Sequence, residues 1–395
     1  MSKTRDHRNV FILATCQMLN GSGRTLIAAT SPLIALGIAP NPVLATLPIT
    51  LMILGTAFTT LPASFLMRRI GRRWGFVIGG LLGAVGGVIS VGGLLVSSFW
   101  LFSIGNMFFG IYAAFSHYYR FAATDVAPNH FKGTAISLVL VGGVAGAFLG
   151  PELAKAGVDL FTAIKFIGTY IFLIVVTLMS SLVVLAVDIP SLTPAETDNS
   201  GRPLSEILRT PTFIVAATVA TISQAVMNFL MTATPLAMYH VGHLFGDTAF
   251  VIEWHSFAMF APGFFTGSLI KRFGTILMIF TGLAIQLLAI GVALSGDSII
   301  LFWASLFLVG LGWNFAFISA TTLLTDVHTP SERAKVQGIN NFIIFGFVAF
   351  SSLMSGTIHH FFGWHWVNLV IIPLILIAIA TTMWFIVTQR KNLTQ

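Results

Sequence analysis

The sequence predicts an all-α fold: a polytopic membrane protein whose twelve transmembrane helices form two parallel six-helix bundles. Three observations lead to it: the composition, the number of long apolar runs and the placement of the basic residues. Hydrophobic residues make up 56% of the 395-residue chain and charged residues only 8%, whereas soluble domains carry about 25% charged residues. A core of this length cannot hide so much apolar surface, because surface shrinks slowly relative to volume. Lipid must therefore surround most of the chain.

Each of the apolar runs is long enough to cross a bilayer core of about 30 Å, for which a helix needs roughly 20 residues. In chain order the runs cover residues 10–36, 42–67, 73–96, 99–124, 134–156, 164–187, 212–239, 248–270, 275–295, 298–324, 336–358 and 366–388. The first run lacks a small-residue cleavage site, so we expect a retained helix and not a signal peptide.

The one long polar stretch, residues 188–211, separates the sixth run from the seventh and is rich in Pro, Ser and Thr. It predicts a linker with a short surface helix around Leu204–Leu208. We therefore expect an N-terminal six-helix bundle at 1–188, a cytoplasmic central linker at 189–211 and a C-terminal six-helix bundle at 212–395.

The basic residues predict the orientation of the chain in the membrane. With the N-terminus inside, 16 of the 20 Lys and Arg residues face the cytoplasm, Lys155 and Lys165 face outward, and Arg24 and Arg120 lie within runs. Cytoplasmic loops of membrane proteins carry an excess of cations. We therefore expect an inner (plasma) membrane protein with both termini in the cytoplasm, and a cytoplasmic turn at residues 68–73 (RRIGRR).

The two halves of the sequence repeat each other. Ser-Pro-Leu at 31–33 aligns with Thr-Pro-Leu at 234–236, and Arg69-Ile70-Gly71 aligns at the same shift with Arg272-Phe273-Gly274. TDVAP at 124–128 matches TDVHTP at 325–330. Each half holds an even number of spans, so both repeats enter the membrane from the same side and are parallel.

These landmarks resemble those of the major facilitator superfamily of transporters over essentially the whole chain. The loop between the second and third helices of that family reads roughly G-x-x-x-D-R-x-G-R-R. The positions here that follow this pattern are Ser64, Arg69, Gly71, Arg72 and Arg73, with a second-half copy at Gly267, Lys271, Arg272 and Gly274. Arg68 and Lys271 stand where the family carries its acid.

The fifth run carries a second resemblance. Gly146, Gly150 and Pro151 are similar to the Gly-Pro motif of drug:proton antiporters, although Ser137 and Ala154-Lys155 replace other glycines of that motif. The resemblance implies a weak likeness to the antiporter branch and slightly favours efflux over uptake.

A conformational gate needs an interaction that one state has and the other lacks. Two acids, Asp125 and Asp326, end the fourth and tenth runs on the side of the basic turns, where ion pairs would latch the outward-facing state. The alternative is that these charges only anchor the topology. The candidate gating residues are Arg69, Gly71, Arg72, Asp125, Lys271, Arg272, Gly274 and Asp326.

Polar side chains form stripes inside four of the apolar runs, and a charge near mid-membrane indicates function because it is costly there. The resemblance implies that the first, fourth, seventh and tenth helices line a central cavity. The alternative is hydrogen bonding between helices, at about 0.6–2 kcal/mol for each bond. The candidate substrate-binding residues are Asn20, Arg24, His117, Arg120, Gln224, Asn228, Trp313 and Asn314.

Two titratable residues are candidates for proton coupling. Glu253 lies near the outer end of the eighth run, and His117 lies in the fourth. A carboxyl or imidazole that titrates near neutrality carries a proton between states. The alternatives are a static salt bridge or interfacial position for Glu253 and a packing role for His117.

The cavity charges are mainly positive, which favours an anionic or amphiphilic organic solute, since arginine forms forked bonds to carboxylate or phosphate. The leading hypothesis is a proton-coupled secondary transporter that works by alternating access. Proton-linked uptake of an organic acid or metal chelate is the second, and a receptor or scaffold without flux is the third. No Gly-x-Ser-x-Gly or His-Glu-x-x-His motif is present, so we expect no enzyme.

Motifs that the sequence lacks argue against several other kinds of partner. No basic domain is present, so we expect no nucleic acid. A single cysteine, Cys16, excludes an intramolecular disulfide. Six histidines toward the outer face of the second half lack metal-ligand spacing, so we expect no metal site. We expect a monomer in the lipid bilayer that uses protons and a small-molecule substrate but no cofactor.

Overall fold

The computed structural model of the chain describes residues 2–128, 131–189, 201–329 and 332–393, and the regular elements in these ranges are all helical. The first half contains α1 (Ser2–Ile38), η1 (Pro42–Leu44), α2 (Leu47–Ile70), α3 (Arg72–Leu95), α4 (Phe99–Ser116), α5 (Tyr119–Val126), α6 (Lys132–Val158) and α7 (Ile167–Val184). After α8 (Leu204–Leu208) the second half contains α9 (Pro211–His240), α10 (Phe245–Phe260), α11 (Gly263–Phe273), α12 (Thr275–Ala293), α13 (Ile299–Thr325), α14 (Arg333–Leu369) and α15 (Ile372–Leu393). The predicted all-α membrane fold is confirmed.

Within the described residues, nine helical segments are long and apolar enough to cross a membrane. They account for ten of the expected runs, because one segment, Lys335–Gln389, contains the last two. Two expected runs do not meet this criterion. One is the first run, which forms α1 and whose hydropathy is lowered by Gln17, Asn20 and Arg24. The other run that falls short is the eighth, which the structure divides into α10 and α11.

Local backbone chemistry places the helix ends and repeats between the halves. Gly71 separates α2 from α3 with φ 86° and ψ 153°, and Gly274 separates α11 from α12 with φ 84° and ψ 153°. A positive φ of this size is accessible chiefly to glycine. Ser98 and Ser298 cap the N-termini of α4 and α13. The hydroxyl oxygen of each serine accepts a hydrogen bond from the backbone N–H three residues later, that of Leu101 or Leu301.

Three expected helices differ from the structure in their continuity. The run 99–124 is divided into α4 and α5 around His117–Tyr118. The run 248–270 is divided at Ala261–Pro262, because proline has no N–H to continue the ladder. The run 336–358 extends to Leu369 through a bend at Gly363, where φ is 77°.

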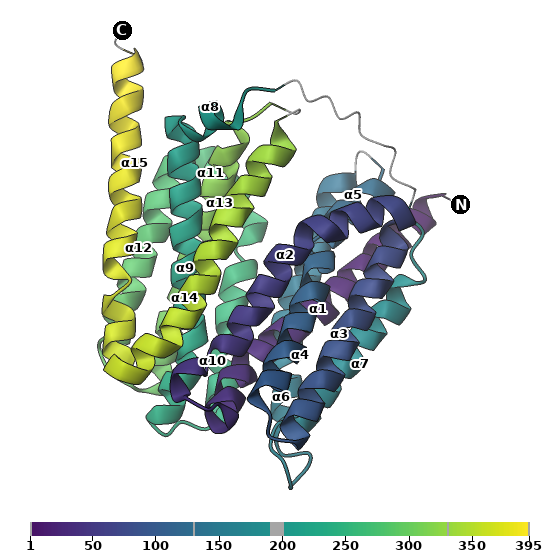
Figure 1. Cartoon of the computed structure of the whole chain (residues 1–395). Helices are drawn as coiled ribbons and strands as arrows, with labels where there is room; N and C mark the ends of the chain where they lie inside the picture. The colour runs from purple at the N-terminus through teal and green to yellow at the C-terminus, as the bar shows by residue number, and fades with distance from the viewer. Residues whose placement is uncertain (1, 129–130, 190–200, 330–331, 394–395) are drawn as a thin grey trace.

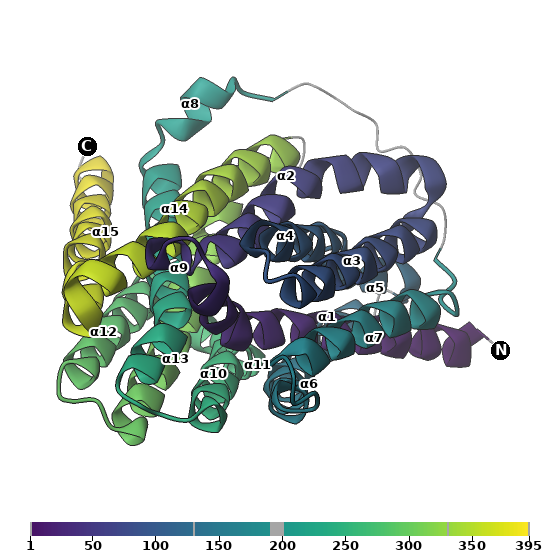
Figure 2. The ribbon, with the colours of Figure 1, turned by 60° about the horizontal axis from the view of Figure 1, so that its bottom comes forward.

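The helices form two groups, α1–α7 and α9–α15, joined by the chain that includes α8 (Figure 1). Both chain termini lie at one end of the molecule, together with α5 and α8; we call it the terminal end and the opposite one the distal end. The ribbons of the two groups converge at the distal end and diverge at the terminal end. A second view shows α1 and α9 near the line where the groups meet (Figure 2).

Aromatic side chains join the two groups at the distal end. The ring of Phe148 on α6 lies 5.9 Å from Trp254 and 5.6 Å from Phe257 on α10, measured between ring centroids. Phe166, just before α7, lies 5.3 Å from Phe245 at the start of α10. Edge-to-face ring contacts at these separations are favourable. They close the molecule at this end.

Candidate substrate cavity

One face of α1 is open in the middle of the helix, where most of the other residues are buried. Gln17 and Gly21 are half-buried and Arg24 is exposed, at the i, i+4, i+7 spacing of a single helical face. The next residues toward the distal end, 25–32, are all buried. Because α1 packs against helices of both groups, the exposed guanidinium lies in a hollow inside the molecule.

The second group shows the same pattern on α9. Gln224, Asn228 and Met231 are half-buried at i, i+4 and i+7, and residues 232–238 beyond them are all buried. Since α1 and α9 contact each other across the two groups, we infer that their stripes border one hollow. Both stripes stop before the distal end, so the hollow opens toward the terminal end.

Cationic groups gather along the first-half wall of this hollow. Arg24 and Arg120 both act electrostatically on His117, which indicates that the three groups lie close together. The guanidinium carbon of Arg120 lies 4.9 Å from the centroid of the Phe121 ring. The His117 ring stacks on Phe345 of α14 at a centroid distance of 6.2 Å. No carboxylate in the described part of the chain forms an ion pair with either arginine.

A flat aromatic pair, Trp313 and Phe317, lies on α13 of the second half; Trp313 is 9% exposed and Phe317 is half-buried. The indole N–H of Trp313 donates a hydrogen bond of 2.7 Å to Oε1 of Gln224. Its ring stacks on Phe317 at a centroid distance of 5.1 Å and an interplanar angle of 17°. The bond and the stack fix the plane of the indole. Phe317 and Phe345 were absent from the sequence-based candidates, because phenylalanines in apolar runs carry no polar signal.

The three asparagines of the candidate set have different surroundings. Asn314 is buried, donates to the Met259 carbonyl at 2.6 Å and accepts from the Thr266 hydroxyl at 2.6 Å, so it joins α13 to α10 and α11. Asn20 is also buried, inside the first half. The half-buried Asn228 has an Nδ2 without a hydrogen-bond partner among the described residues. Nδ2 of Asn20 likewise has no partner in the described ranges, both amide nitrogens are shielded from solvent, and substrate binding by all three asparagines stays a prediction.

Glu253 lies at the contact between the two groups. It is 9% exposed on α10, and Lys155 and Glu152 of α6 act electrostatically on it. Lys155 itself forms an ion pair with Glu152. His255, two residues further, faces α13 instead, where its Nδ1 lies 2.7 Å from the Leu306 carbonyl oxygen. Glu253 is therefore near the distal contact and not in the hollow.

The basic turn of the first half forms one ion pair at the terminal end. Nη1 of Arg72 lies 2.7 Å from Oδ2 of Asp125 and so joins α3 to α5. Both residues belong to the first half, so the pair does not bridge the groups. In the second half Asp326, Lys271 and Arg272 are exposed and have no ion pair in the described ranges. A state-dependent latch by these residues stays a prediction.

The linker is attached to the second half through Glu332, which sequence reasoning missed. Its carboxylate accepts from Nε and Nη2 of Arg202 at 3.0 Å each and from the backbone N–H groups of Arg202 and Thr329. The Arg202 bonds, followed by the Thr329 bond, hold the pKa of Glu332 well below its usual range. The Thr-x-x-Glu spacing of a capping box was the available signal.

The glycines of the fifth run allow α6 to approach α1 closely. The Thr25 hydroxyl donates to the Gly146 carbonyl at 3.2 Å. A Cβ added at Gly150 would overlap Thr25 Oγ1 and the Ser22 carbonyl oxygen, whereas one added at Gly143 would have no neighbour nearer than 3.8 Å. The motif thus packs against the segment of α1 that presents Arg24.

We expect Gly150→Ala to destabilise the protein by about 1–3 kcal/mol, the usual cost of overpacking a closely packed contact. Gly143→Ala, about two turns away on the same helix, is the matched control and should be neutral or stabilising, because alanine favours helix over glycine. Thermal unfolding in detergent measures both. Equal stabilities of the two variants would contradict a close α1–α6 contact.

Comparison with known proteins agrees with this architecture. The family model of the Major Facilitator Superfamily matches residues 13–345 and, in a second match, 220–395. The chain is 40% identical over 378 residues to the riboflavin transporter RfnT of Brucella anthropi, covering 95% of each protein. It is 31% identical to the uncharacterized MFS-type transporter YdeG of Bacillus subtilis, covering 89% of this chain and 85% of that protein.

Solved structures share the fold at low sequence identity. A bacterial homolog of the human lysosomal transporter Spinster, in an inward-facing and occupied conformation, superposes with a TM-score of 0.75 at 14% identity, covering 99% of this chain and 98% of that one. Its inward-facing and unoccupied form gives 0.74 at 15% identity, covering 100% and 99%. With the helices, the repeated turns and the hollow between the groups, these matches show that the chain is a multi-pass secondary transporter of the major facilitator superfamily and not an enzyme.

Proposed function

We propose that this chain is a proton-coupled transporter of riboflavin or a closely related flavin. The observation that carries the proposal is the presence, on helices of the two groups, of a fixed aromatic plane, Trp313 on Phe317, and of the Arg24 guanidinium, which has no ion pair in the described part of the chain. The 40% identity to a protein named as a riboflavin transporter supports the same substrate class.

The chemistry of a flavin suits these two walls. Its tricyclic ring is flat and largely apolar, so it stacks on an indole whose plane is held by Gln224. One edge of the ring carries carbonyl oxygens, which accept charge-assisted bonds from a guanidinium. The ribityl chain carries hydroxyl groups, for which the half-buried Asn228 on α9 would be a polar partner. Riboflavin is thus the amphiphilic solute that the sequence favours, and a phosphorylated flavin is the anionic one.

The closed distal end and the hollow open at the terminal end support transport by alternating access. The basic residues favour a cytoplasmic terminal end in the inner (plasma) membrane, so the present state is inward-facing. Rocking of the two groups would part the Phe148 and Phe166 contacts and open the distal end. The transporter is proposed to act as a monomer, because one chain carries both walls.

The proposal also includes a direction of transport. The likeness of Gly146, Gly150 and Pro151 to drug:proton antiporters favours efflux in exchange for protons. Proton-linked uptake is the other outcome of the test. Purified protein in liposomes, with an imposed pH gradient, separates the two by the sign of the flavin movement. Absence of saturable movement of riboflavin and of its phosphate in either direction would refute the flavin proposal.

We expect Trp313→Leu to raise the KM for riboflavin about 2- to 12-fold, since an aromatic stack contributes about 0.5–1.5 kcal/mol beyond buried area. Trp313→Phe keeps the stack but loses the bond to Gln224, so its KM should lie between that of the unmodified protein and that of Trp313→Leu. Trp303→Leu, on the same helix, is the control and should retain the KM. Initial rates of flavin fluorescence change in liposomes give the values. An unchanged KM in Trp313→Leu would remove the aromatic wall from the binding site.

A further inference from the structure

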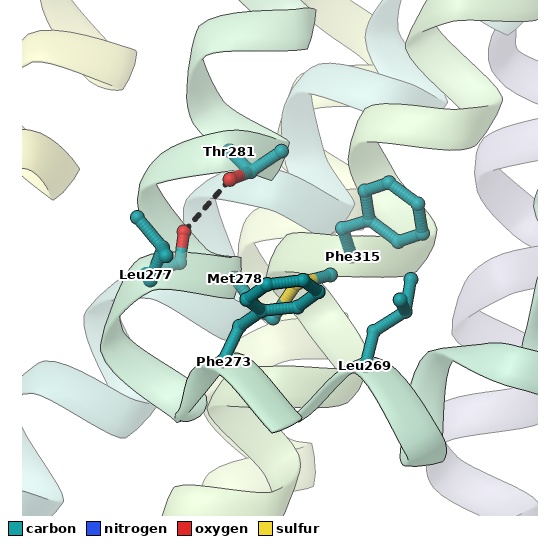
Figure 3. Close-up of a pocket in the computed structure, with 6 residues that line it drawn as sticks. All are labelled: Leu269, Phe273, Leu277, Met278, Thr281 and Phe315. Atoms are coloured by element: carbon teal, nitrogen blue, oxygen red, sulfur yellow. Dashed lines mark hydrogen bonds between the residues drawn. The ribbon is translucent and has the colours of Figure 1, made fainter. Parts of the chain in front are cut away.

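A pocket of about 290 Å³ lies outside the central hollow, between α11, α12 and α13. Figure 3 shows its lining, which consists of Leu269, Phe273, Leu277, Met278, Thr281 and Phe315. The single hydroxyl among them, on Thr281, donates to the Leu277 carbonyl at 2.9 Å. The lining therefore offers no free polar group, and only an apolar occupant suits it.

The pocket is open to the surroundings of the bundle on one side. Its floor is buried, with Met278 at 4% and Phe315 at 9% exposure, whereas its walls Phe273 and Leu277 are exposed at 48% and 53%. In a membrane protein an exposed apolar wall of this kind faces acyl chains. The occupant is therefore a chain that enters from the membrane.

Arg272 stands at the mouth of this pocket, at the end of α11. The guanidinium carbon of Arg272 lies 5.2 Å from the centroid of the Phe273 ring, which is itself a wall. Lys271 precedes it, and both side chains are exposed without an ion pair in the described part of the chain. In the first half, by contrast, Arg72 has Asp125 as its partner. The second-half cations thus remain available to an anion outside the protein.

The pocket lies at the same level of the bundle as these basic residues. It occupies the last turn of α11 and the first two turns of α12, on either side of the Gly274 turn. This is the end of the bundle that the basic residues assign to the cytoplasm, where the leaflet carries anionic lipid. A phosphate at the level of Lys271 and Arg272 would have its acyl chain beside Phe273 and Leu277.

We propose that this groove is a binding site for an anionic phospholipid of the cytoplasmic leaflet. Arg272 binds the phosphate, Lys271 adds its charge at the same level of the membrane, and the apolar pocket holds part of one acyl chain. The site is separate from the flavin site and does not depend on the transported solute. It gives the second-half basic turn a ligand in place of the acid that the first-half turn uses.

The test uses the full-length protein in phosphatidylcholine liposomes with a trace of phosphatidylglycerol whose acyl chain carries a photoreactive diazirine. Labelled peptides are mapped by mass spectrometry and compared with those from the matching phosphatidylcholine probe. Residues 269–281 should be labelled preferentially by the anionic probe, by about fivefold for each of the two cations. Lack of labelling in this segment, or equal labelling by both probes, would overturn the proposal.

Three variants assign the effect. The double variant Lys271→Gln with Arg272→Gln should lower labelling by the anionic probe to the level of the phosphatidylcholine probe. The matched control, Arg68→Gln with Arg69→Gln at the first-half turn, should leave it unchanged. Thr281→Phe, which fills the groove and keeps both cations, should reduce labelling by either probe. Full anionic labelling in the Lys271/Arg272 variant, or in Thr281→Phe, would refute the site. Gel filtration and circular dichroism verify folding, and Thr281→Phe decides if the double variant does not fold.

Discussion

Arg24→Gln is expected to lower riboflavin transport about 10- to 100-fold, because a hydrogen bond to a charged group contributes about 1.5–3 kcal/mol and we propose that the Arg24 guanidinium makes such a bond to the solute. The guanidinium is exposed in the hollow and has no carboxylate partner in the described chain, so its removal leaves no buried charge unpaired. Folding and membrane insertion should therefore be unchanged. The loss should appear as a raised Kd in a flavin-binding titration as well as in the flux.

Two further variants separate charge from geometry at this position. Arg24→Lys keeps the charge but loses the planar fork, so it should recover only part of the binding. Arg120→Gln removes a cation of the same cavity that is partly engaged with the Phe121 ring. Its effect should be smaller for riboflavin and larger for the phosphorylated flavin, whose charge responds to the sum of the cations. Full transport by Arg24→Gln would exclude the guanidinium from solute binding.

Glu253→Gln is expected to abolish the dependence of transport on the pH gradient while flavin exchange at equal pH continues. Glu253 lies between the groups at the distal end, beside Lys155 of the opposite half. When ionised it attracts Lys155 and holds the distal contact closed; when protonated it loses this attraction. A proton taken up here would thus favour the opening of the distal end. The amide cannot change its charge, so the link between protons and opening is lost.

Glu152→Gln is the matched control for this experiment. Glu152 also neighbours Lys155, but its side chain is exposed at 58% and lies on the same helix as the lysine. Its loss should leave gradient-driven transport unchanged. His117→Gln tests the other titratable candidate in the same assay. Gradient-driven accumulation by Glu253→Gln at the unmodified rate would exclude this carboxyl as the proton carrier.

Much of the fold could be predicted because its signals are local. An apolar run predicts a span whatever surrounds it, since the cost of exposing a polar backbone to lipid leaves only the helix. The turns at Gly71 and Gly274 repeat because both need a positive φ. Interrupted helices were harder to predict. Pro262 was a visible breaker, but the division at His117–Tyr118 has no comparable sequence signal.

The candidate site shows which features the sequence predicted and which depended on the tertiary structure. The sequence by itself determined the membrane fold, the duplication and the presence of arginines too costly to face lipid. Only the tertiary structure decided that Arg24 faces a hollow while Asn20, one turn earlier, is buried. It also brought Trp313 to Gln224 from another helix and used both polar groups of Asn314 between helices. The physical reason is that helical periodicity defines which residues share a face, whereas the neighbouring helix determines whether that face meets water, lipid or protein.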